Sequence, residues 1–236
     1  MKNIAIIPAR GGSKRIPRKN IKPFMGKPII AYSIEAALQS GLFDEVMVST
    51  DDEEIATVAR QYGASVPFFR SAETANDYAT MENVIEEVLN CYQERGISFD
   101  AFCCVFSTAP FLKSQSLVNS YNTFENNAYD ALMPVLSFSY PIQRALFLEN
   151  SRLLMREPEH IHTRSQDLQP MYHDAGLFYW MKVDKFYETK EILCDNTGMI
   201  ELSEVEAQDI DTEEDWKLAE LKYQILGKNG NLNVER

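Results

Sequence analysis

NIAIIPARGGSKRIPRKN, residues 3 to 20, joins a short apolar run to a basic loop that contains two glycines. The apolar run, Asn3 to Ile7, predicts a buried strand. The first 34 residues carry eight basic side chains and no acidic one, whereas the whole chain has a formal net charge of −12. This concentration of positive charge favours a site where a polyphosphate lies against backbone N–H groups and cationic side chains. We therefore expect a nucleotide site directly after the first strand. The alternative is a basic loop that only faces solvent.

The composition is typical of a soluble enzyme with one core. Of 236 residues, 45% are hydrophobic and 25% charged, so we expect a single domain over residues 1–236. No apolar run approaches the roughly 18 residues of a membrane span, and the fold begins without a leader, so we expect no membrane association and a cytoplasmic location. Four cysteines without metal-binding spacing agree with reduced thiols. A pI near 4.8 argues against nucleic acid as a partner.

Strand-like and helix-like segments alternate from residue 3 to residue 136. The expected strands are 3–7, 45–49, 65–69, 101–106 and 131–136, and the expected helices are 27–39, 51–63, 80–94 and 114–124. This order predicts an α/β fold with a Rossmann-like, mostly parallel sheet flanked by helices. Ligands of such sheets bind at the carboxyl ends of the strands.

The alternation stops between residues 137 and 170, a polar stretch that three prolines interrupt. It is either a mobile loop or an extension that packs on something outside the domain. We favour contact with a partner subunit, and therefore a homodimer with a dimerisation extension. Beyond it we expect strands at 176–181 and 199–202, a terminal helix at 212–225 and an irregular end at 227–236.

The glycine loop differs from two standard phosphate-binding motifs. It lacks the G-x-x-x-x-G-K-[ST] pattern of the Walker A loop and the three spaced glycines of a dinucleotide fingerprint. Around Gly11 and Gly12 it instead gathers Arg10, Ser13, Lys14, Arg15, Arg18, Lys19 and Lys22. Fixed positive charge of this density suits a triphosphate whose pyrophosphate leaves, because charge that develops on the leaving oxygens needs preorganised stabilisation.

A pair of carboxylates near the carboxyl end forms the second candidate cluster. In Asp209-Ile210-Asp211 the acids alternate along an extended segment, so both point to one side while Ile210 points inward. Paired hard oxygens suit Mg²⁺, which could bridge phosphate oxygens and assist deprotonation of an attacking hydroxyl. The other interpretation is a helix cap, supplied by Asp211 or Thr212, plus a surface acid; both roles can coexist.

The chain resembles the acylneuraminate (CMP-sialic acid) cytidylyltransferase family. The resemblance rests on four motifs in order: PARGGSKRIPRKN at residues 8–20, STDDEEIATVARQYGASVPFFRSAETA at 49–75, STAP at 107–110 and DIDTEEDW at 209–216. It implies a fold of the nucleotide-diphospho-sugar transferase type. It also implies a nucleotidyltransferase that uses Mg²⁺ to transfer CMP from CTP to the anomeric hydroxyl of a nonulosonic acid, with release of pyrophosphate.

The resemblance also implies roles for individual residues. It places Arg10, Gly11, Gly12, Ser13, Lys14, Lys19, Asn20, Arg70 and Thr108 at the nucleotide. Lys19 would stabilise charge at the α-phosphate, and Arg10 belongs with it to the catalytic set. Asp209 and Asp211 match the metal-binding pair, and Asp211 would help to deprotonate the sugar hydroxyl. Arg164 matches a position that serves the carboxylate of the acceptor.

Departures from the family pattern concern the acceptor. Phe106 replaces a glutamine on the nucleotide side, Gln143 a lysine, and the segment from His173 to Gly176 an R-x-N-G motif. The motifs STAPF, YPIQRAL and HDAGLFYW resemble the pseudaminic acid branch of the family, whose acceptor occurs on bacterial surface glycans and flagellins. We expect the altered contacts at Gln143, Arg144, His173 and Asp174.

Several alternatives stay open at this point. The acceptor could be sialic or legionaminic acid instead. Outside enzymes, a CTP-sensing module would bind the nucleotide without releasing pyrophosphate, and a basic-arm nucleic-acid binder would show an affinity that depends steeply on salt.

Overall fold

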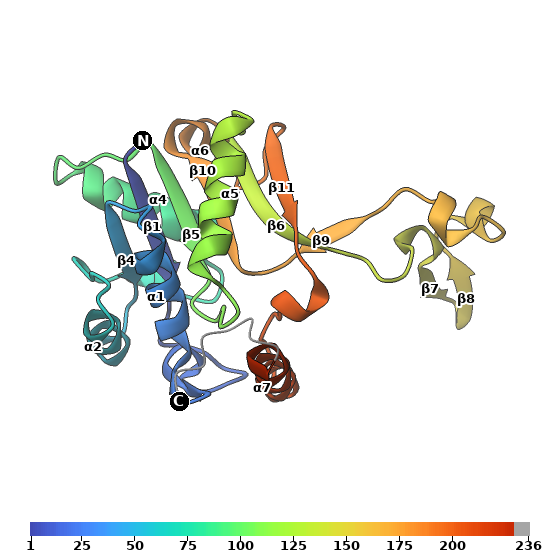
Figure 1. Ribbon diagram of the computed structural model, residues 1–236, viewed down its shortest axis with the longest axis horizontal. Coiled ribbons are helices and arrows are strands. Elements are labelled where there is room, and N and C mark those ends of the chain that lie inside the picture. Colours follow the sequence, from blue (N-terminus) through green and yellow to red (C-terminus); the bar gives the residue numbers. More distant parts are fainter. Residues whose placement is uncertain (229–236) are drawn as a thin grey trace.

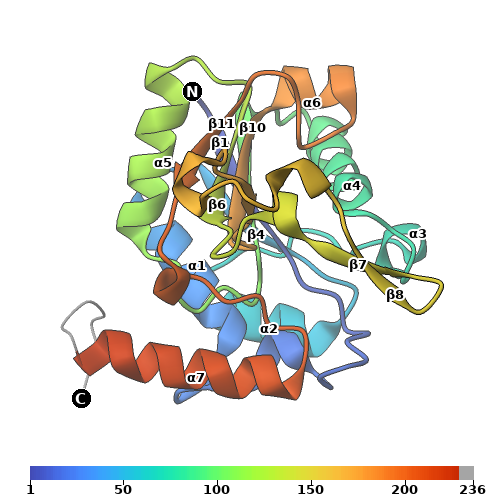
Figure 2. The same cartoon turned by 90° about the vertical axis from the view of Figure 1, so that its right-hand side faces the viewer.

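The central sheet lies between two layers of helices (Figures 1 and 2). The protein is described from a computed structural model for residues 1–228. Seven strands form the sheet in the order β11 (Thr197–Glu201), β6 (Ala131–Ser137), β10 (Phe178–Lys182), β5 (Ala101–Val105), β1 (Asn3–Pro8) and β4 (Glu45–Ser49), with β9 (Tyr172–Asp174) also paired to β6. This arrangement confirms the expected fold class.

The strand directions make the sheet mixed. β1 pairs in parallel with β4 and β5, and β6 pairs in parallel with β11, whereas β9 and β10 run antiparallel to β6. After β6 the chain leaves the sheet, turns back and pairs with the strand it has just left. A chain that returns in this way without a crossover runs antiparallel to its neighbour.

All but one of the helices bury apolar side chains, whereas the short helix at residues 72–75 has no buried residue. They are α1 (Ile29–Ser40), α2 (Glu53–Gln61), α3 (Ala72–Ala75), α4 (Met81–Gln93), α5 (Ser114–Asn126), α6 (Val183–Thr189) and α7 (Glu213–Lys228). Figure 2 shows α1 and α5 on one side of the sheet and α4 and α6 on the other. Successive residues of β1 enter different cores: Ala5 and Ile7 pack with residues of α1 and α5, and Ile4 and Ile6 with residues of α4. This alternation is the period of two that a strand buried on both faces requires.

A third cluster holds α7 under the amino-terminal loop. Phe24, from the short hairpin of β2 (Pro23–Phe24) and β3 (Lys27–Pro28), packs edge-to-face on Trp216 of α7 and on Tyr32. Both Phe24 and Trp216 are buried. The packing brings the start of α7, and the acidic segment before it, next to the basic loop.

Most predicted elements are confirmed within one or two residues, but one strand is wrong. Residues 65–69 contribute a single bridge, Ser65 to Met47, and no strand. Pro67 explains the failure, because proline has no N–H to extend the ladder. Several short elements, among them α3, α6, β2, β3 and β9, were not predicted. Gly227 and Lys228, expected to be irregular, belong to α7, and the rest of that expected end, 229–236, lies outside the described residues.

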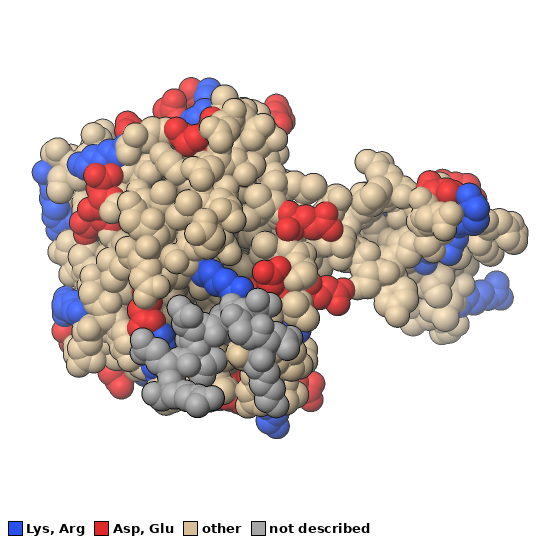
Figure 3. All heavy atoms as spheres, viewed as in Figure 1, with Lys and Arg blue, Asp and Glu red and all other residues tan. Residues whose placement is uncertain are grey.

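Residues 137–170 form an arm that projects from the body of the molecule (Figure 1). The arm carries the hairpin of β7 (Leu146–Glu149) and β8 (Arg152–Met155), whose turn residues Asn150 and Ser151 both have positive φ, as a tight hairpin turn requires. Residues 137–170 thus extend away from the sheet, while their expected role in dimerisation stays a prediction. Several large apolar side chains of the arm are exposed, including Tyr140 at 85% and Leu148 at 71%. Figure 3 shows a largely uncharged visible surface on the arm, with charged side chains gathered toward its outer end.

Across residues 1–228, no helix combines the length and the apolar character that crossing a bilayer would demand.

Candidate active site

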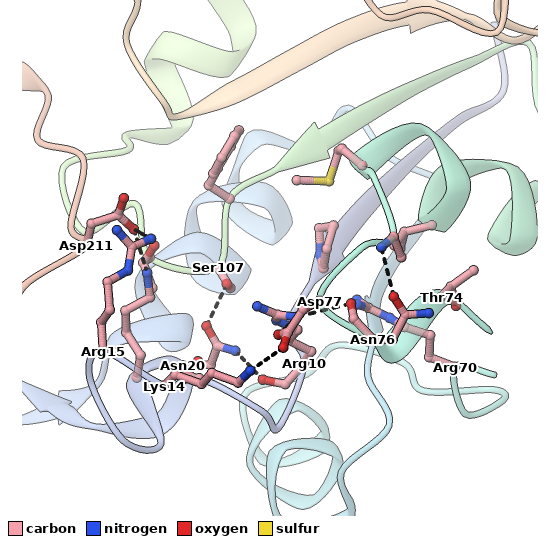
Figure 4. A pocket seen from close by; sticks show the side chains of 18 of the residues that line it. Arg10, Lys14, Arg15, Asn20, Arg70, Thr74, Asn76, Asp77, Ser107 and Asp211 are labelled. Carbon is pink, nitrogen blue, oxygen red and sulfur yellow. Dashed lines mark hydrogen bonds and ion pairs between the residues drawn. The ribbon is translucent and has the colours of Figure 1, made fainter. Parts of the chain in front are cut away.

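A cavity of about 520 Å³ opens at the carboxyl ends of β1 and β5, where the strand order predicts a ligand. The basic loop after β1, the segment from Arg70 to Val84, the residues that follow β5, and Asp211 line it (Figure 4). Four cationic side chains of the loop, Arg10, Lys14, Arg15 and Lys19, belong to this lining. The predicted nucleotide residues Ser13, Asn20, Arg70 and Thr108 also lie here.

Asn20 fixes the path of the basic loop. Its side chain is buried, donates from Nδ2 to the carbonyl oxygen of Arg10 at 2.9 Å, and accepts at Oδ1 from the Ser107 hydroxyl at 2.9 Å. Asn20 thereby ties the start of the loop to the residues after β5. The cationic groups of the loop are preorganised around the cavity, which is the condition for strong electrostatic stabilisation.

The two glycines differ from each other. A Cβ atom on Gly11 would lie 2.8 Å from Oδ2 of Asp52, whereas one on Gly12 would meet nothing within 4 Å. The backbone N–H of Gly11 already donates to Oδ1 of Asp51 at 2.9 Å. Neither glycine belongs to the residues that line the cavity. Gly11 therefore serves the close approach of the loop to the end of β4, while direct contact of either glycine with a ligand stays a prediction.

The structure divides the basic residues into two groups. Arg10 and Lys14 both pair with Asp77 on the far rim of the cavity, and Arg15 and Lys19 lie beside Asp211. By contrast, the guanidinium of Arg18 pairs with Asp52 and Glu54, and the ammonium of Lys22 pairs with Glu213 and lies 4.5 Å from the ring centre of Trp216. The first group faces the ligand space, and the second holds the loop against α2 and α7.

Lys19 joins the two candidate clusters. Its Nζ donates to the carbonyl oxygen of Ile210 at 2.7 Å and lies 3.6 Å from Oδ1 of Asp211. Arg15 approaches the same carboxylate oxygen at 3.0 Å. Residues separated by 191 positions in the sequence therefore meet at one edge of the cavity, where the basic loop contacts the acidic segment.

The middle residue of the acidic segment points inward, as the sequence predicts. Ile210 is fully buried between the two acids. Partial burial, together with the neighbouring charge of Asp211, raises the pKa of the Asp209 carboxyl. Mutual repulsion of this kind is relieved by a bound cation, and two hard carboxylate oxygens fit Mg²⁺. Asp211 lines the cavity, whereas Asp209 is not among the lining residues, so a metal site shared by the two carboxylates stays a prediction.

The cap of α7 uses other groups. The hydroxyl of Thr212 accepts from the backbone N–H of Asp215 at 3.2 Å, and the Asp215 carboxylate accepts from the N–H groups of Thr212 and Asp211 at 2.8 and 3.1 Å. Of the two candidate caps, Thr212 is the residue that acts. The carboxylates of Asp209 and Asp211 remain free of this duty and can serve a metal ion.

Arg70 is a buried cation at the opposite end of the cavity. Its side chain is only 8% exposed, and it donates to the hydroxyl and carbonyl oxygens of Ser49 at 3.1 and 2.6 Å. Burial lowers the pKa of its guanidinium. Within residues 1–228, no carboxylate lies within ion-pair distance of Arg70. A buried guanidinium without such a partner is suited to a polar or anionic ligand.

The predicted acceptor residues do not reach the cavity within one chain. Gln143, Arg144 and Arg164 lie on the arm, where they contact the carbonyl oxygens of Gln169 and His160 and the carboxylate of Asp167, respectively. His173 and Asp174 lie on β9, where the His173 ring packs against Phe138 with centroids 4.9 Å apart. Both oxygens of Asp174 already accept hydrogen bonds, from the N–H of Gly176 and from the Tyr179 hydroxyl.

Comparison with known proteins agrees with this geometry. The sequence model of the family described as Cytidylyltransferase matches residues 4–224. The chain belongs to the cytidylyltransferase family. It is 45% identical to the pseudaminic acid cytidylyltransferase of Campylobacter jejuni, over 95% of this chain and 97% of that protein. It is 34% identical to the CMP-N,N'-diacetyllegionaminic acid synthase of Legionella pneumophila, over 93% and 95% of the two chains.

Among solved structures, this cytidylyltransferase is similar in fold to a CMP:2-keto-3-deoxy-manno-octonic acid synthetase complexed with CTP. The TM-score is 0.69 at 19% identity, and the match covers 97% of this chain and all of the other. The expected family and enzyme class, a nucleotidyltransferase, are thus confirmed, and the mixed sheet is that of a nucleotidyltransferase fold.

Sequence reasoning missed one wall of the cytidylyltransferase cavity. Asn76, Asp77, Met81 and Val84 line it, and Glu87 of α4 anchors their segment by accepting from the N–H of Ser71 at 2.8 Å and from the Thr74 hydroxyl. These residues follow no strand and form no motif. Only the long-range ion pairs of Asp77 with the basic loop reveal their place in the site.

Proposed function

We propose that this cytidylyltransferase transfers CMP from CTP to the anomeric hydroxyl of pseudaminic acid and releases pyrophosphate. The observation that carries the proposal is the meeting of Lys19 with the Asp209–Asp211 segment at the edge of a cavity with four loop cations. A site for triphosphate and a site for a divalent cation thereby adjoin. The similarity over nearly the whole chain to a pseudaminic acid cytidylyltransferase supports this choice of acceptor.

In the proposed binding mode, the triphosphate of CTP lies on the basic loop. Arg10, Ser13, Lys14 and Lys19 surround the phosphates, and Asn20, Arg70 and Thr108 complete the nucleotide site. Gly11 and Gly12 shape the loop beneath them. Asp77 competes for Arg10 and Lys14, so its ion pairs are exchanged for phosphate contacts when CTP binds.

Asp209 and Asp211 would hold Mg²⁺, which supplies charge neutralisation at the phosphate oxygens and lowers the pKa of the attacking hydroxyl. The acceptor hydroxyl attacks the α-phosphorus in line with the departing pyrophosphate, and Asp211 assists removal of its proton. Lys19 and Arg10 stabilise the negative charge that develops on the phosphate oxygens. No covalent intermediate with the protein is needed.

Acceptor recognition is proposed to involve the arm of a second subunit in a homodimer. Gln143, Arg144 and Arg164 lie on the arm, and its exposed apolar side chains provide a surface that association would bury. In this arrangement Arg164 exchanges Asp167 for the carboxylate of the acceptor. His173, near the base of the arm, contacts the acceptor from the sheet. We place the enzyme in the cytoplasm and its product in bacterial surface glycan or flagellin modification.

A pyrophosphate-release assay with CTP and Mg²⁺ tests the proposed reaction. Purified enzyme is offered pseudaminic, legionaminic and N-acetylneuraminic acids at equal concentration. We expect the highest kcat/KM with pseudaminic acid. A higher value with either other acid would reassign the acceptor. Binding of CTP without release of pyrophosphate in the presence of any of the three acids would favour a CTP-sensing module.

A further inference from the structure

A bend in the backbone separates β9 from β10, and it lies against the acidic pair. From Asp174 to Trp180 the chain advances six residues, while the paired positions on β6 advance only three, from Val135 to Leu132. The extra residues bulge out of the ladder at Gly176, whose φ of +66° is one that glycine adopts without strain.

The side chain of Asp174 closes this bend. Its Oδ1 accepts from the N–H of Gly176 at 2.8 Å, and its Oδ2 accepts from the hydroxyl of Tyr179, three residues further along the chain than Gly176. The carboxylate therefore bridges the two ends of the bulge. A carboxylate with both oxygens engaged in this way is held in one orientation, and it holds the bulge in return.

The bend in turn lies against Asp209. A Cβ atom placed on Gly176 would be 3.8 Å from Cβ and 4.0 Å from Cγ of Asp209, so the Asp209 side chain rests beside the Gly176 backbone. The ring of Tyr179 also contacts Phe106 edge-to-face, with centroids 5.3 Å apart, and Phe106 lines the cavity. The Asp174–Tyr179 pair thus adjoins Asp209 through Gly176 and contacts Phe106 through the Tyr179 ring, while neither residue lines the cavity.

We propose that Asp174 and Tyr179 are positioning residues that set the place of the Asp209 carboxylate through the Gly176 bend. The proposal rests on the proposed role of Asp209 and Asp211 as the cation-binding pair. It replaces direct acceptor contact as the function of Asp174, because both oxygens of that carboxylate are already used within the chain. Residues that orient a ligating carboxylate affect metal affinity by about 10- to 100-fold when they are changed.

Tyr179→Phe provides the sharpest test, because it removes the hydroxyl and keeps the ring that packs on Phe106. Tyr187→Phe is the matched control: Tyr187 lies on α6, and its hydroxyl donates to Oδ1 of Asn90 at 2.8 Å, outside the cavity. Mn²⁺ affinity is measured by calorimetric titration of the enzyme saturated with CTP. CTP affinity in EDTA and the unfolding temperature are measured beside it.

We expect Tyr179→Phe to weaken Mn²⁺ binding about 10-fold while CTP affinity in EDTA stays within about twofold of the wild type. Tyr187→Phe should change neither. Asp174→Asn should reproduce the loss, and adding Tyr179→Phe to Asp209→Asn should cause no further loss, because the tyrosine acts through that carboxylate.

Three results would overturn the inference, and they are distinguishable. Unchanged Mn²⁺ affinity in Tyr179→Phe, with a large loss in Asp209→Asn, would refute the positioning role and leave the proposed function intact. Unchanged Mn²⁺ affinity in Asp209→Asn itself would refute the metal role on which both rest. A Tyr179→Phe variant that loses Mn²⁺ affinity, CTP affinity in EDTA and unfolding temperature together would show a general structural effect. That result would reject the specific positioning role.

Discussion

Replacing Lys19 with methionine removes one positive charge from the point where the basic loop meets the acidic segment. Methionine keeps most of the length of the side chain, so packing changes little. The lost ammonium is 20% exposed, donates to Ile210 at 2.7 Å and lies 3.6 Å from Asp211. Loss of one preorganised group that stabilises developing charge typically lowers kcat by about 10²- to 10³-fold, or about 3–4 kcal/mol of the barrier. We expect a reduction of this size in Lys19→Met.

The effect of Lys19→Met on stability should be much smaller. One hydrogen bond to a carbonyl and one half-exposed ion pair contribute together about 1–2 kcal/mol, or a few degrees in the unfolding temperature of a domain of this size. Lys22→Met is the control, because Lys22 comes from the same loop but pairs with Glu213 and lies over Trp216. Pyrophosphate release at saturating CTP should fall only in Lys19→Met. Equal turnover in the two variants would refute the assignment of Lys19.

Three further predictions concern the framework and the rim of the site. The pKa of Asp52 is lowered to about 2, mainly by its hydrogen bond from Arg18, so its contribution to stability is complete above pH 4 and is lost as the pH falls toward 2. Asp52→Asn retains a helix cap but not the charge. In urea unfolding, the free energy of unfolding should fall less between pH 4 and pH 2 in this variant than in the wild type. Equal losses in the two proteins would contradict the prediction. Gly11→Ala should cost about 1–3 kcal/mol of stability, because its Cβ would lie 2.8 Å from Oδ2 of Asp52. Gly12→Ala should be near neutral, because a Cβ there would meet nothing within 4 Å. Thermal unfolding of the two variants measures the difference. Asp77→Asn should lower the Kd for CTP by up to about fivefold, since the carboxylate that competes for Arg10 and Lys14 is gone, and weaker CTP binding in calorimetry would show that Asp77 helps the nucleotide instead.

The layered sheet and the position of the cavity beside the basic loop could be predicted from local patterns. The run Ile4 to Ile7 is apolar on both faces, and the helices expected at 27–39 and 51–63 are present as α1, with Gly41 as its C-cap, and α2, with Asp52 as its N-cap. These signals involve residues within a few positions of each other. The antiparallel direction of β10 depends on where the chain returns to the sheet, and the absence of a strand at 65–69 depends on Pro67. Hydrophobic periodicity predicts neither.

The division of the basic loop is likewise a property of the folded chain. Lys19 and Lys22 are alike in type and neighbourhood, yet the first reaches the cavity and the second pairs with Glu213 on α7. Asp77 lies in a segment without a motif. Asp174 and Tyr179 belong to the HDAGLFYW motif, but their pairing follows from contacts in the folded chain. The acceptor residues on the arm are the part of the prediction that a single chain does not assemble.

A crystal structure with CTP and Mg²⁺ would show whether the basic loop and the acidic pair meet around one nucleotide. We expect the triphosphate along Arg10, Lys14 and Lys19, and the metal ion bound by Asp209 and Asp211 and in contact with phosphate oxygens. A triphosphate bound away from this loop, or a metal ion that contacts neither carboxylate, would contradict this expectation.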